Sequence, residues 1–236
     1  MIPKIIHYCW FGHNPLPEDA QRCITSWRKY FPQYEIKLWN ETNFDVNRIS
    51  YTKEAYKLKK YAFVSDYARM WILYHYGGLY FDTDVEVIKP MDDIIQLGSF
   101  MGMEAQHDGV STIAVAPGLG LGVNPGLGLL KTILQNYENR HFVSWDGRIT
   151  ETIVTIISRI IEEEGIEIMP DGIYKSGDLF IYPPEYFCPK NYYTGEMIIT
   201  NDTRSIHHYT ASWKTTSVSF FGKIKKRIKY ICVRFF

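Results

Sequence analysis

The order of apolar and polar positions along the chain predicts an α/β domain. A short apolar run at residues 2–10 is followed by a helical pattern at 18–30, which ends before Pro32, and by a second apolar run at 35–39. Short apolar runs bounded by Gly or Pro are typical of buried strands. Strand, helix and strand in close succession predict the opening of an α/β fold.

A longer helical pattern occupies residues 54–76 and ends at Gly77 and Gly78. Its apolar positions lie on more than one side, which indicates a helix buried in the domain. A short strand is expected at 79–81, and strand character resumes at 85–88. The rest of the chain predicts helices at 126–139 and 149–164, and short strands near 99–103, 166–169, 179–182 and 205–209.

Two aspartates, Asp82 and Asp84, follow the aromatic strand at 79–81. In an extended segment residues i and i+2 point to the same side, so the two carboxylates converge. Their repulsion has to be relieved by protonation or by a cation, and Mg²⁺ or Mn²⁺ commonly bridges carboxylates to substrate phosphates. A solvated turn is the competing interpretation. A buried helix, a glycine pair and the aromatic strand at 79–81, which lead to the aspartates in that order, favour the metal site.

Asp66 and Arg69 lie three residues apart on the predicted helix and therefore share a face. One interpretation is a helical ion pair that contributes about 0.2–0.5 kcal/mol. The other is a functional polar surface, because ionised groups on a helix that is mostly apolar have to be paired or used.

Composition and cysteine usage exclude several classes of protein. The chain of 236 residues is 46% hydrophobic and 16% aromatic, which is typical of a packed globular protein and not of a disordered one. Its four cysteines form no CxxC pair, which argues against a zinc site or a disulfide framework and fits a reducing compartment. The start lacks the pattern of a signal peptide, and no run is long enough to span a membrane. We expect a cytoplasmic protein, peripheral on the inner face of the membrane.

The membrane expectation depends on the end of the chain. Six of the 26 basic residues fall within 223–234, which leaves 20 basic against 26 acidic residues elsewhere. A nucleic-acid-binding protein carries its basic charge on the folded body, so no nucleic-acid partner is expected. Apolar residues recur at helical spacing in this tail, at Ile224, Ile228, Ile231 and Phe235. The pattern predicts a domain at 1–215 and a basic amphipathic tail at 216–236 that binds anionic membranes, or else a helix packed on the domain.

Three segments together resemble a known family. Residues 2–12 (IPKIIHYCWFG), 62–69 (AFVSDYAR) and 73–84 (LYHYGGLYFDTD) are similar to the family 32 glycosyltransferases. That family includes sugar transferases of the bacterial capsular and polysaccharide type, and shares its sugar-binding region with the large clostridial toxins. The resemblance covers residues 1–95 and, more loosely, 205–213.

The resemblance implies a GT-A fold, with a single Rossmann-like nucleotide-sugar-binding domain, a mixed sheet and flanking helices. It also implies a retaining hexosyltransferase that depends on Mn²⁺ or Mg²⁺. The donor would be a nucleotide-sugar, with a UDP-sugar favoured, and the acceptor a glycan or lipid-linked glycan in capsular polysaccharide synthesis. The catalytic set implied by the family comprises four residues. Asp66 and Arg69 would bond the donor sugar hydroxyls, Asp82 would contact ribose or metal, and Asp84 would be the principal metal ligand.

Four further residues are expected to bind the donor. Trp10 would stack on the nucleotide base, unless it is a core aromatic at a strand end, and Tyr80 lies beside the aspartates. Ser212 and Trp213 could donate hydrogen bonds to the diphosphate, unless Trp213 belongs to the core.

The two histidines of the 205–213 segment, His207 and His208, alternate along a strand, so only one can face the metal. We favour His207. A solvated histidine without a metal is the alternative.

The middle of the chain supports weaker expectations. Residues 118–126 are rich in glycine but lack the Gly-Lys-Ser/Thr of a phosphate-binding loop, so we interpret them as a flexible loop near the acceptor, or a plain turn. Asp146 and Glu151 are candidates for acceptor contact. Two other functions stay open: a metal-dependent nucleotide-sugar hydrolase or nucleotidyltransferase, and a non-catalytic carbohydrate-binding protein.

Overall fold

The computed structural model describes residues 1–105, 113–143, 151–192 and 194–210. Four expectations fall outside these residues: the tail at 216–236, Ser212, Trp213 and Asp146. Among the described helices, none is both long enough and apolar enough to cross a membrane.

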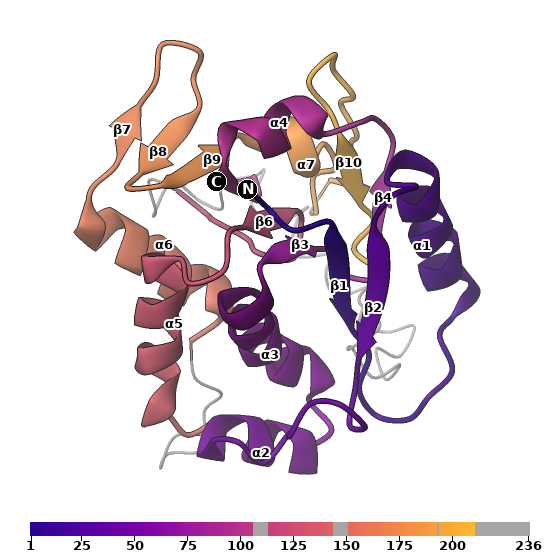
Figure 1. Cartoon of the computed structure of the whole chain (residues 1–236), viewed down its shortest axis with the longest axis vertical. Coiled ribbons are helices and arrows are strands. Elements are labelled where there is room, and N and C mark those ends of the chain that lie inside the picture. The colour runs from indigo at the N-terminus through magenta and orange to yellow at the C-terminus, as the bar shows by residue number, and fades with distance from the viewer. Residues whose placement is uncertain (106–112, 144–150, 193, 211–236) are drawn as a thin grey trace, which may run out of the picture.

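An eight-stranded mixed sheet forms the centre of the molecule, in the order β2-β1-β3-β6-β5-β9-β8-β7, and a two-stranded sheet joins β4 to β10 (Figure 1). The strands are β1 Ile5–Cys9, β2 Glu35–Trp39, β3 Gly78–Tyr80, β4 Val85–Val87, β5 Ser99–Gly102, β6 Leu121–Val123, β7 Glu167–Ile168, β8 Tyr174–Ser176, β9 Leu179–Tyr182 and β10 Ser205–His207. The helices are α1 Glu18–Tyr30, α2 Ser50–Lys57, α3 Tyr61–Tyr76, α4 Asp92–Leu97, α5 Gly128–Glu138, α6 Ile153–Glu164 and α7 Pro184–Phe187.

The large sheet contains both parallel and antiparallel strand pairs. Strand β1 runs parallel to both β2 and β3, and β5 runs parallel to β9. Strand β6 lies between β3 and β5 and is antiparallel to both. The α/β class and the mixed sheet with flanking helices that the sequence predicts are therefore confirmed.

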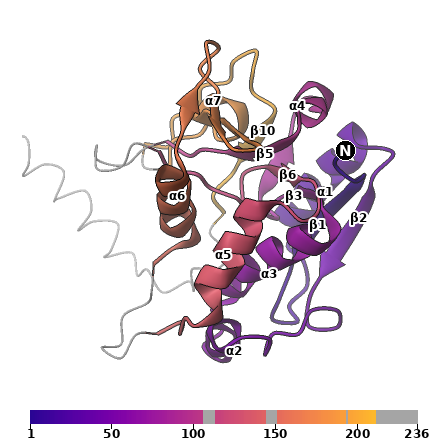
Figure 2. The ribbon, with the colours of Figure 1, turned by 60° about the vertical axis from the view of Figure 1, so that its left-hand side comes forward.

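Two apolar cores cover the two faces of the large sheet. One core contains residues of α3, α5 and α6, and the other contains residues of α1, α4 and α7. Successive strand residues contribute to opposite cores, as Leu79 and Tyr80 of β3 show. Helix α3 packs on β1 and on α5, and Figure 2 shows α5 alongside α3. This arrangement explains why α3 has apolar residues on more than one side.

The predicted helix at 54–76 is wrong in one respect, because two helices occupy this part of the chain. Helix α2 ends at Lys57 and α3 begins at Tyr61. Between them Lys59 adopts a left-handed backbone conformation with φ of 57°, which a continuous helix does not contain.

The glycine-rich segment at 118–126 is not a flexible loop. It contains β6, whose three residues are buried in the middle of the sheet. A Cβ atom on Gly122 would lie 2.3 Å from the Phe100 ring, so the lack of a side chain lets the strand pack there. The short elements α4, β8 and α7 are also absent from the sequence prediction.

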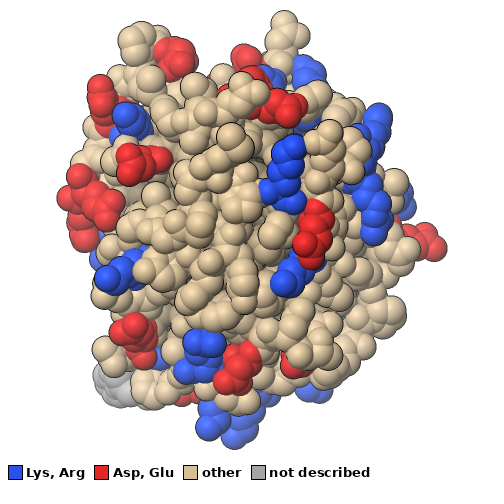
Figure 3. All heavy atoms as spheres, in the orientation of Figure 1, with Lys and Arg blue, Asp and Glu red and all other residues tan. Residues whose placement is uncertain are grey.

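Charged residues are spread over the visible surface without a dominant sign. In Figure 3 acidic and basic side chains surround a broad uncharged area on the face in view. Neither sign forms a continuous field there, and the whole chain has a formal net charge of zero.

Candidate functional site

The aspartate pair lies where β3 leaves the large sheet. Strand β3 ends at Tyr80, and residues 82–84 form the turn that leads into β4 and the small sheet. Two backbone hydrogen bonds hold this turn, from Asp82 N to Gly118 O at 3.0 Å and from Val85 N to Asp82 O at 3.0 Å. Since β1 and β3 are parallel, the turn follows the carboxyl ends of both strands, which is where open α/β sheets bind ligands.

Arg69 connects two of the predicted carboxylates. Its Nη2 atom lies 2.9 Å from Asp66 Oδ1 and 3.3 Å from Asp82 Oδ1, and its Nη1 atom lies 3.4 Å from Asp82 Oδ2. Its Nε atom donates to Ser65 O at 3.2 Å, and the guanidinium carbon lies 4.9 Å from the centre of the Tyr80 ring. The Arg69 side chain is only 5% exposed. The structure thus brings Asp66, Arg69 and Asp82 together around one buried guanidinium.

The two carboxylates around Arg69 are harder to ionise than usual. Burial raises the pKa of Asp66 to about 7, although Arg69 opposes this and Asp82 adds to it. Burial also raises the pKa of Asp82; Arg69 opposes this, while Asp84 adds to it. One guanidinium therefore serves two carboxylates, and the site would be stabilised by a further positive charge.

Asp84 is held in the opposite way, as a permanent anion. Its Oδ1 atom lies 3.1 Å from His207 Nε2, and its Oδ2 atom accepts from the backbone nitrogen of Thr210 at 3.0 Å and from its hydroxyl at 3.2 Å. Burial alone would raise the pKa of Asp84, but the hydrogen bond and charge of His207 and the two donors of Thr210 lower it to about 2. Conversely, burial lowers the pKa of His207, but the hydrogen bond and charge of Asp84, together with the charges of Asp82 and Glu104, leave it raised.

The alternation expected for the two histidines is confirmed. The antiparallel register pairs His207 with Val85, which places the imidazole against Asp84. His208 points away and lies 2.8 Å from Glu86 Oε2. Its backbone nitrogen donates to Asp84 O at 2.9 Å, so the two-stranded sheet itself helps to fix the second aspartate.

Three further predicted residues lie in the described part of the chain, and their surroundings differ. Trp10 follows β1 and is partly exposed, with its indole N–H donating to Asn14 O at 2.7 Å. Tyr80 is 1% exposed, and its hydroxyl donates to Asp82 Oδ1 at 3.2 Å, so it orients Asp82 and offers no open surface to a donor. Glu151 is paired with Arg140 at 3.0 Å on the surface.

Three residues near the aspartates were missed in the sequence. A Cβ atom on Gly118 would lie 2.0 Å from Asp82 Oδ2, so this glycine fits directly against the carboxylate. Glu104 follows β5, and its charge contributes to the raised pKa of His207. Tyr209 has φ of 55°, and its ring centre lies 4.1 Å from that of His207. The glycine-rich run was the signal for Gly118 and the 205–213 segment the signal for Tyr209, whereas no local pattern marks Glu104.

The chemistry of the paired aspartates suits a hard divalent cation. Such ions are often held by one or two carboxylates, and water or phosphate oxygens complete the shell. Within the described ranges no group of three His, Cys, Asp or Glu side chains is arranged to hold a metal by protein ligands alone. Asp82 and Asp84, with His207 beside Asp84, are therefore the residues that would hold Mn²⁺ or Mg²⁺ together with a bound diphosphate.

The segment that contains Asp66, Arg69, Asp82 and Asp84 is similar to known proteins. Residues 17–100 match the model of the glycosyltransferase sugar-binding region containing a DXD motif. Inositol phosphoceramide mannosyltransferase 1 of Schizosaccharomyces pombe is 33% identical over 42% of this chain and 33% of its own length. Mannosyl phosphorylinositol ceramide synthase CSH1 of Saccharomyces cerevisiae is 29% identical over 43% of this chain and 28% of its own length. The similarity thus spans about a third of those relatives.

A solved structure shows the same fold. It is a glycosyltransferase involved in the glycosylation of the major capsid of PBCV-1, with a TM-score of 0.51 and 13% identity over 89% of this chain and 95% of that one. Residues 17–100, about a third of the chain, are therefore similar to the DXD-containing sugar-binding region of glycosyltransferases, and the α/β fold is of the GT-A type.

Proposed function

We propose that the protein is a metal-dependent glycosyltransferase that moves a sugar from a nucleotide-sugar to a glycan or lipid-linked glycan. The observation that carries this proposal is the contrast between the two aspartates. Asp84 is kept ionised by His207 and Thr210, whereas Asp82 shares Arg69 with Asp66. A cation would thus meet one carboxylate that stays ionised, Asp84, and one whose ionisation it would favour, Asp82. Both follow the end of a parallel pair of strands.

Each residue of the site has a separate task in this proposal. Arg69 fixes Asp82 and Asp66, so that both carboxylates are oriented before a donor arrives. The second oxygen of Asp66 has no hydrogen-bond partner among the described residues and is available to a sugar hydroxyl. Mn²⁺ or Mg²⁺ on Asp82, Asp84 and His207 would neutralise the charge that develops on the departing diphosphate. Ser212 and Trp213 would add donors to the same diphosphate.

The stereochemical course is proposed to be retention by same-face substitution. The sequence singles out no carboxylate nucleophile. In this course the acceptor oxygen forms its bond to the anomeric carbon on the side where the phosphate bond breaks. The departing phosphate oxygen then takes the proton of the acceptor hydroxyl. Proton NMR of the first product reports the anomeric configuration, and an inverted product would refute this course.

The donor and acceptor classes rest on resemblance. The family 32 resemblance favours a UDP-sugar and capsular polysaccharide synthesis, whereas the relatives are named as mannosyltransferases of inositol phosphoceramide. We therefore propose a panel of UDP-linked glucose, galactose and their N-acetylated forms, together with GDP-mannose. Both the family 32 resemblance and the names of the relatives are compatible with a lipid-linked acceptor. We propose such an acceptor, which fits a cytoplasmic protein at the inner face of the membrane.

Titration calorimetry with this panel, with and without Mn²⁺, tests the function. Asp84→Ala should abolish metal-dependent donor binding, whereas Asp178→Ala, in an exposed turn between β8 and β9, should leave it unchanged. Absence of binding to every donor would refute the proposal and favour a carbohydrate-binding protein. Donor cleavage that yields only free sugar, with acceptors present, would favour the hydrolase.

Membrane association through residues 216–236 is proposed from the sequence alone. The wild type should sediment with vesicles that contain anionic lipid, and a chain lacking residues 223–236 should not, because about 1 kcal/mol per basic residue is lost. Equal sedimentation of both proteins would remove this part of the proposal.

A further inference from the structure

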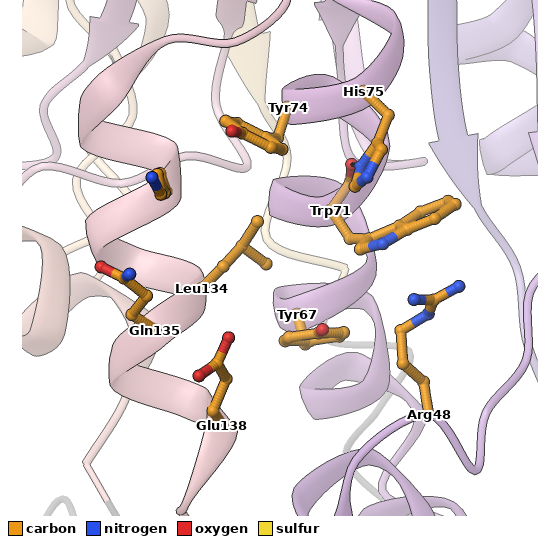
Figure 4. A pocket seen from close by; sticks show the side chains of 9 residues that line it. Arg48, Tyr67, Trp71, Tyr74, His75, Leu134, Gln135 and Glu138 are labelled. Atoms are coloured by element: carbon orange, nitrogen blue, oxygen red, sulfur yellow. Dashed lines mark hydrogen bonds between the residues drawn. The ribbon is translucent and has the colours of Figure 1, made fainter.

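A cavity lies between α3 and α5, on the side of α3 that faces away from the aspartates. Its volume is about 280 Å³, and it is drawn in Figure 4. Helix α3 contributes Tyr67, Trp71 and Tyr74, whose spacing of four and three residues places them on one face. Asp66 and Arg69 project from another face of the same helix. The cavity is therefore separate from the proposed transfer site.

Helix α5 supplies the other wall through residues at the same helical spacing. Figure 4 shows Leu134 pointing toward α3, with Gln135 and Glu138 on the same wall. Among the described residues, the side-chain polar atoms of Tyr67, Gln135 and Glu138 have no hydrogen-bond partner in the protein. A cavity with an apolar floor and uncommitted polar groups around it is typical of a small-molecule site.

One edge of the cavity is fixed by stacked side chains. The Arg48 guanidinium carbon lies 4.3 Å from the centre of the Trp71 ring, and the His75 ring centre also lies 4.3 Å from it. In Figure 4 these two side chains lie above and below Trp71. Since both faces of Trp71 are covered and Tyr67 is only 5% exposed, the partly exposed Tyr74 is the aromatic side chain left for a ligand to pack against.

The polar groups favour a neutral ligand rich in hydroxyl groups. Arg48 and Lys131 are donors only, the Glu138 carboxylate is an acceptor only, and Gln135 is both. A sugar hydroxyl donates and accepts, so it can use both kinds of group, whereas a charged ligand would meet a like charge on one side or the other. The volume lies just below the usual range of ligand pockets, which begins at about 300 Å³, and so favours one sugar ring over a nucleotide.

We propose that this cavity is a second carbohydrate-binding site, which takes one neutral sugar unit of a glycan. The apolar face of the ring packs against Tyr74, and its hydroxyls bond Gln135 and Glu138. The site does not take part in the transfer reaction, so it goes beyond the proposed function. Through this site the protein binds a glycan chain at a distance from the aspartates.

NMR titration of the full ¹⁵N-labelled chain with maltose, cellobiose and mannobiose tests this site. We expect the Trp71 indole and Gln135 amide signals to shift, with a Kd of about 1–10 mM for one neutral disaccharide. Gln135→Ala and Glu138→Ala should each weaken binding at least about fivefold, because each removes a polar partner of the ring. Gln96→Ala, an exposed glutamine on helix α4, is the matched control and should bind as the wild type.

Several outcomes would overturn the proposal. One is the absence of any shift up to about 50 mM disaccharide, which is too weak for a specific site. Others are tighter binding of glucuronic acid or glucosamine than of the neutral sugars, and equal weakening by Gln96→Ala. Displacement of the disaccharide by UDP-glucose or GDP-mannose would also overturn it, because the sugar would then occupy the transfer site. Retention of both ligands at once supports two separate sites.

Discussion

Replacing Gly118 by alanine inserts a methyl group against the first aspartate of the pair. The added Cβ would lie 2.0 Å from Asp82 Oδ2 and 2.9 Å from Arg69 Nη1. Cβ contacts under 3.0 Å essentially do not occur in proteins, so a neighbour has to move. The backbone cannot simply withdraw, because Gly118 O also accepts the hydrogen bond of Asp82 N at 3.0 Å. The substitution therefore displaces the Asp82 carboxylate.

The size of this effect follows from the contacts of Asp82. Its Oδ2 atom has to move by about 1 Å to restore the closest Cβ contact to 3.0 Å. Such a shift disturbs its bonds to the Tyr80 hydroxyl at 3.2 Å and to Arg69 at 3.3 and 3.4 Å. Overpacking of this kind costs about 1–3 kcal/mol. Since the Asp82 side chain is 30% exposed and can swing outward, we expect the lower end of that range.

The effect on function should exceed the effect on stability. A misplacement of about 1 Å in a positioning group can cost about 10²-fold in rate. We expect Gly118→Ala to lose metal-dependent donor binding or turnover by one to two orders of magnitude, on the scale of about 1.4 kcal/mol for each tenfold change. Urea unfolding followed by circular dichroism gives the free energy of unfolding, and calorimetry with the nucleotide-sugar panel gives the binding loss.

Gly128→Ala is the matched control, because an added Cβ there meets nothing within 4 Å. Gly128 is the first residue of α5, so alanine should leave donor binding unchanged and raise the free energy of unfolding by about 0.4–1 kcal/mol. Wild-type donor affinity and stability in Gly118→Ala would refute the reasoning. That result would mean that the fit of Gly118 against Asp82 does not determine where the carboxylate lies.

Three further substitutions test the core and the site. Burial lowers the pKa of His7 from 6.5 to about 4, so the unfolded chain takes up a proton between these values that the folded chain does not. The wild type should thus lose about 3 kcal/mol of unfolding free energy as pH falls through that range. His7→Gln should flatten this slope in urea-unfolding curves, exposed His13→Gln should not, and an unchanged slope in His7→Gln contradicts the assignment. Arg69→Met leaves two carboxylates unpaired and should cost about 3–5 kcal/mol in the same assay. This loss of unfolding free energy should grow from pH 5 to 8 as the carboxylates ionise, and a loss below about 1 kcal/mol contradicts a buried ion pair. Finally, His207→Gln should weaken Mn²⁺-dependent donor binding in calorimetry and His208→Gln should not; the reverse result assigns the metal to His208.

Elements with a local signal could be predicted from the sequence to the residue. The helix at Glu18–Tyr30 and the strand at Glu35–Trp39 have the predicted bounds, because helical periodicity and Pro32 mark the end of one and the start of the next. The break between α2 and α3 has no such mark. It depends on Lys59 in a left-handed conformation, and lysine is not a residue that indicates one.

Strand β6 could not be predicted because its signal is tertiary. Its middle residue, Gly122, lies where the Phe100 ring and the Leu79 side chain already fill the space beside the strand. Glycine in such a run indicates a loop when only the neighbours in sequence are known. The strand becomes evident only when β3 and β5, which come from distant segments, are paired on either side of it.

The residues of the candidate site also fall into two groups, those with a local sequence signal and those that only the fold brings together. The spacing of Asp66 and Arg69 fixes their shared side of a helix. Asp82 and Asp84 lie in the turn after β3 and not in an extended strand, so their surroundings depend on Arg69 and on His207 rather than on their spacing. Glu104 reaches the site from a different segment, so no spacing could reveal it. The role of Tyr80 likewise depends on tertiary contacts. Its ring is covered by the packed core, and its hydroxyl donates to the Asp82 carboxylate, which the sequence alone does not reveal.

Helix α3 explains why the core and the site depend on each other. It is covered by the sheet on one side and by α5 on another, so a charge on these sides is buried and has to be paired. Arg69 finds one carboxylate three residues back on its own helix, at Asp66, and the second at Asp82, which β3 delivers because it pairs beside β1. The guanidinium is thus stabilised only when helix and strand are both in place. For this reason the strand pairing that completes the fold is also the step that assembles the site.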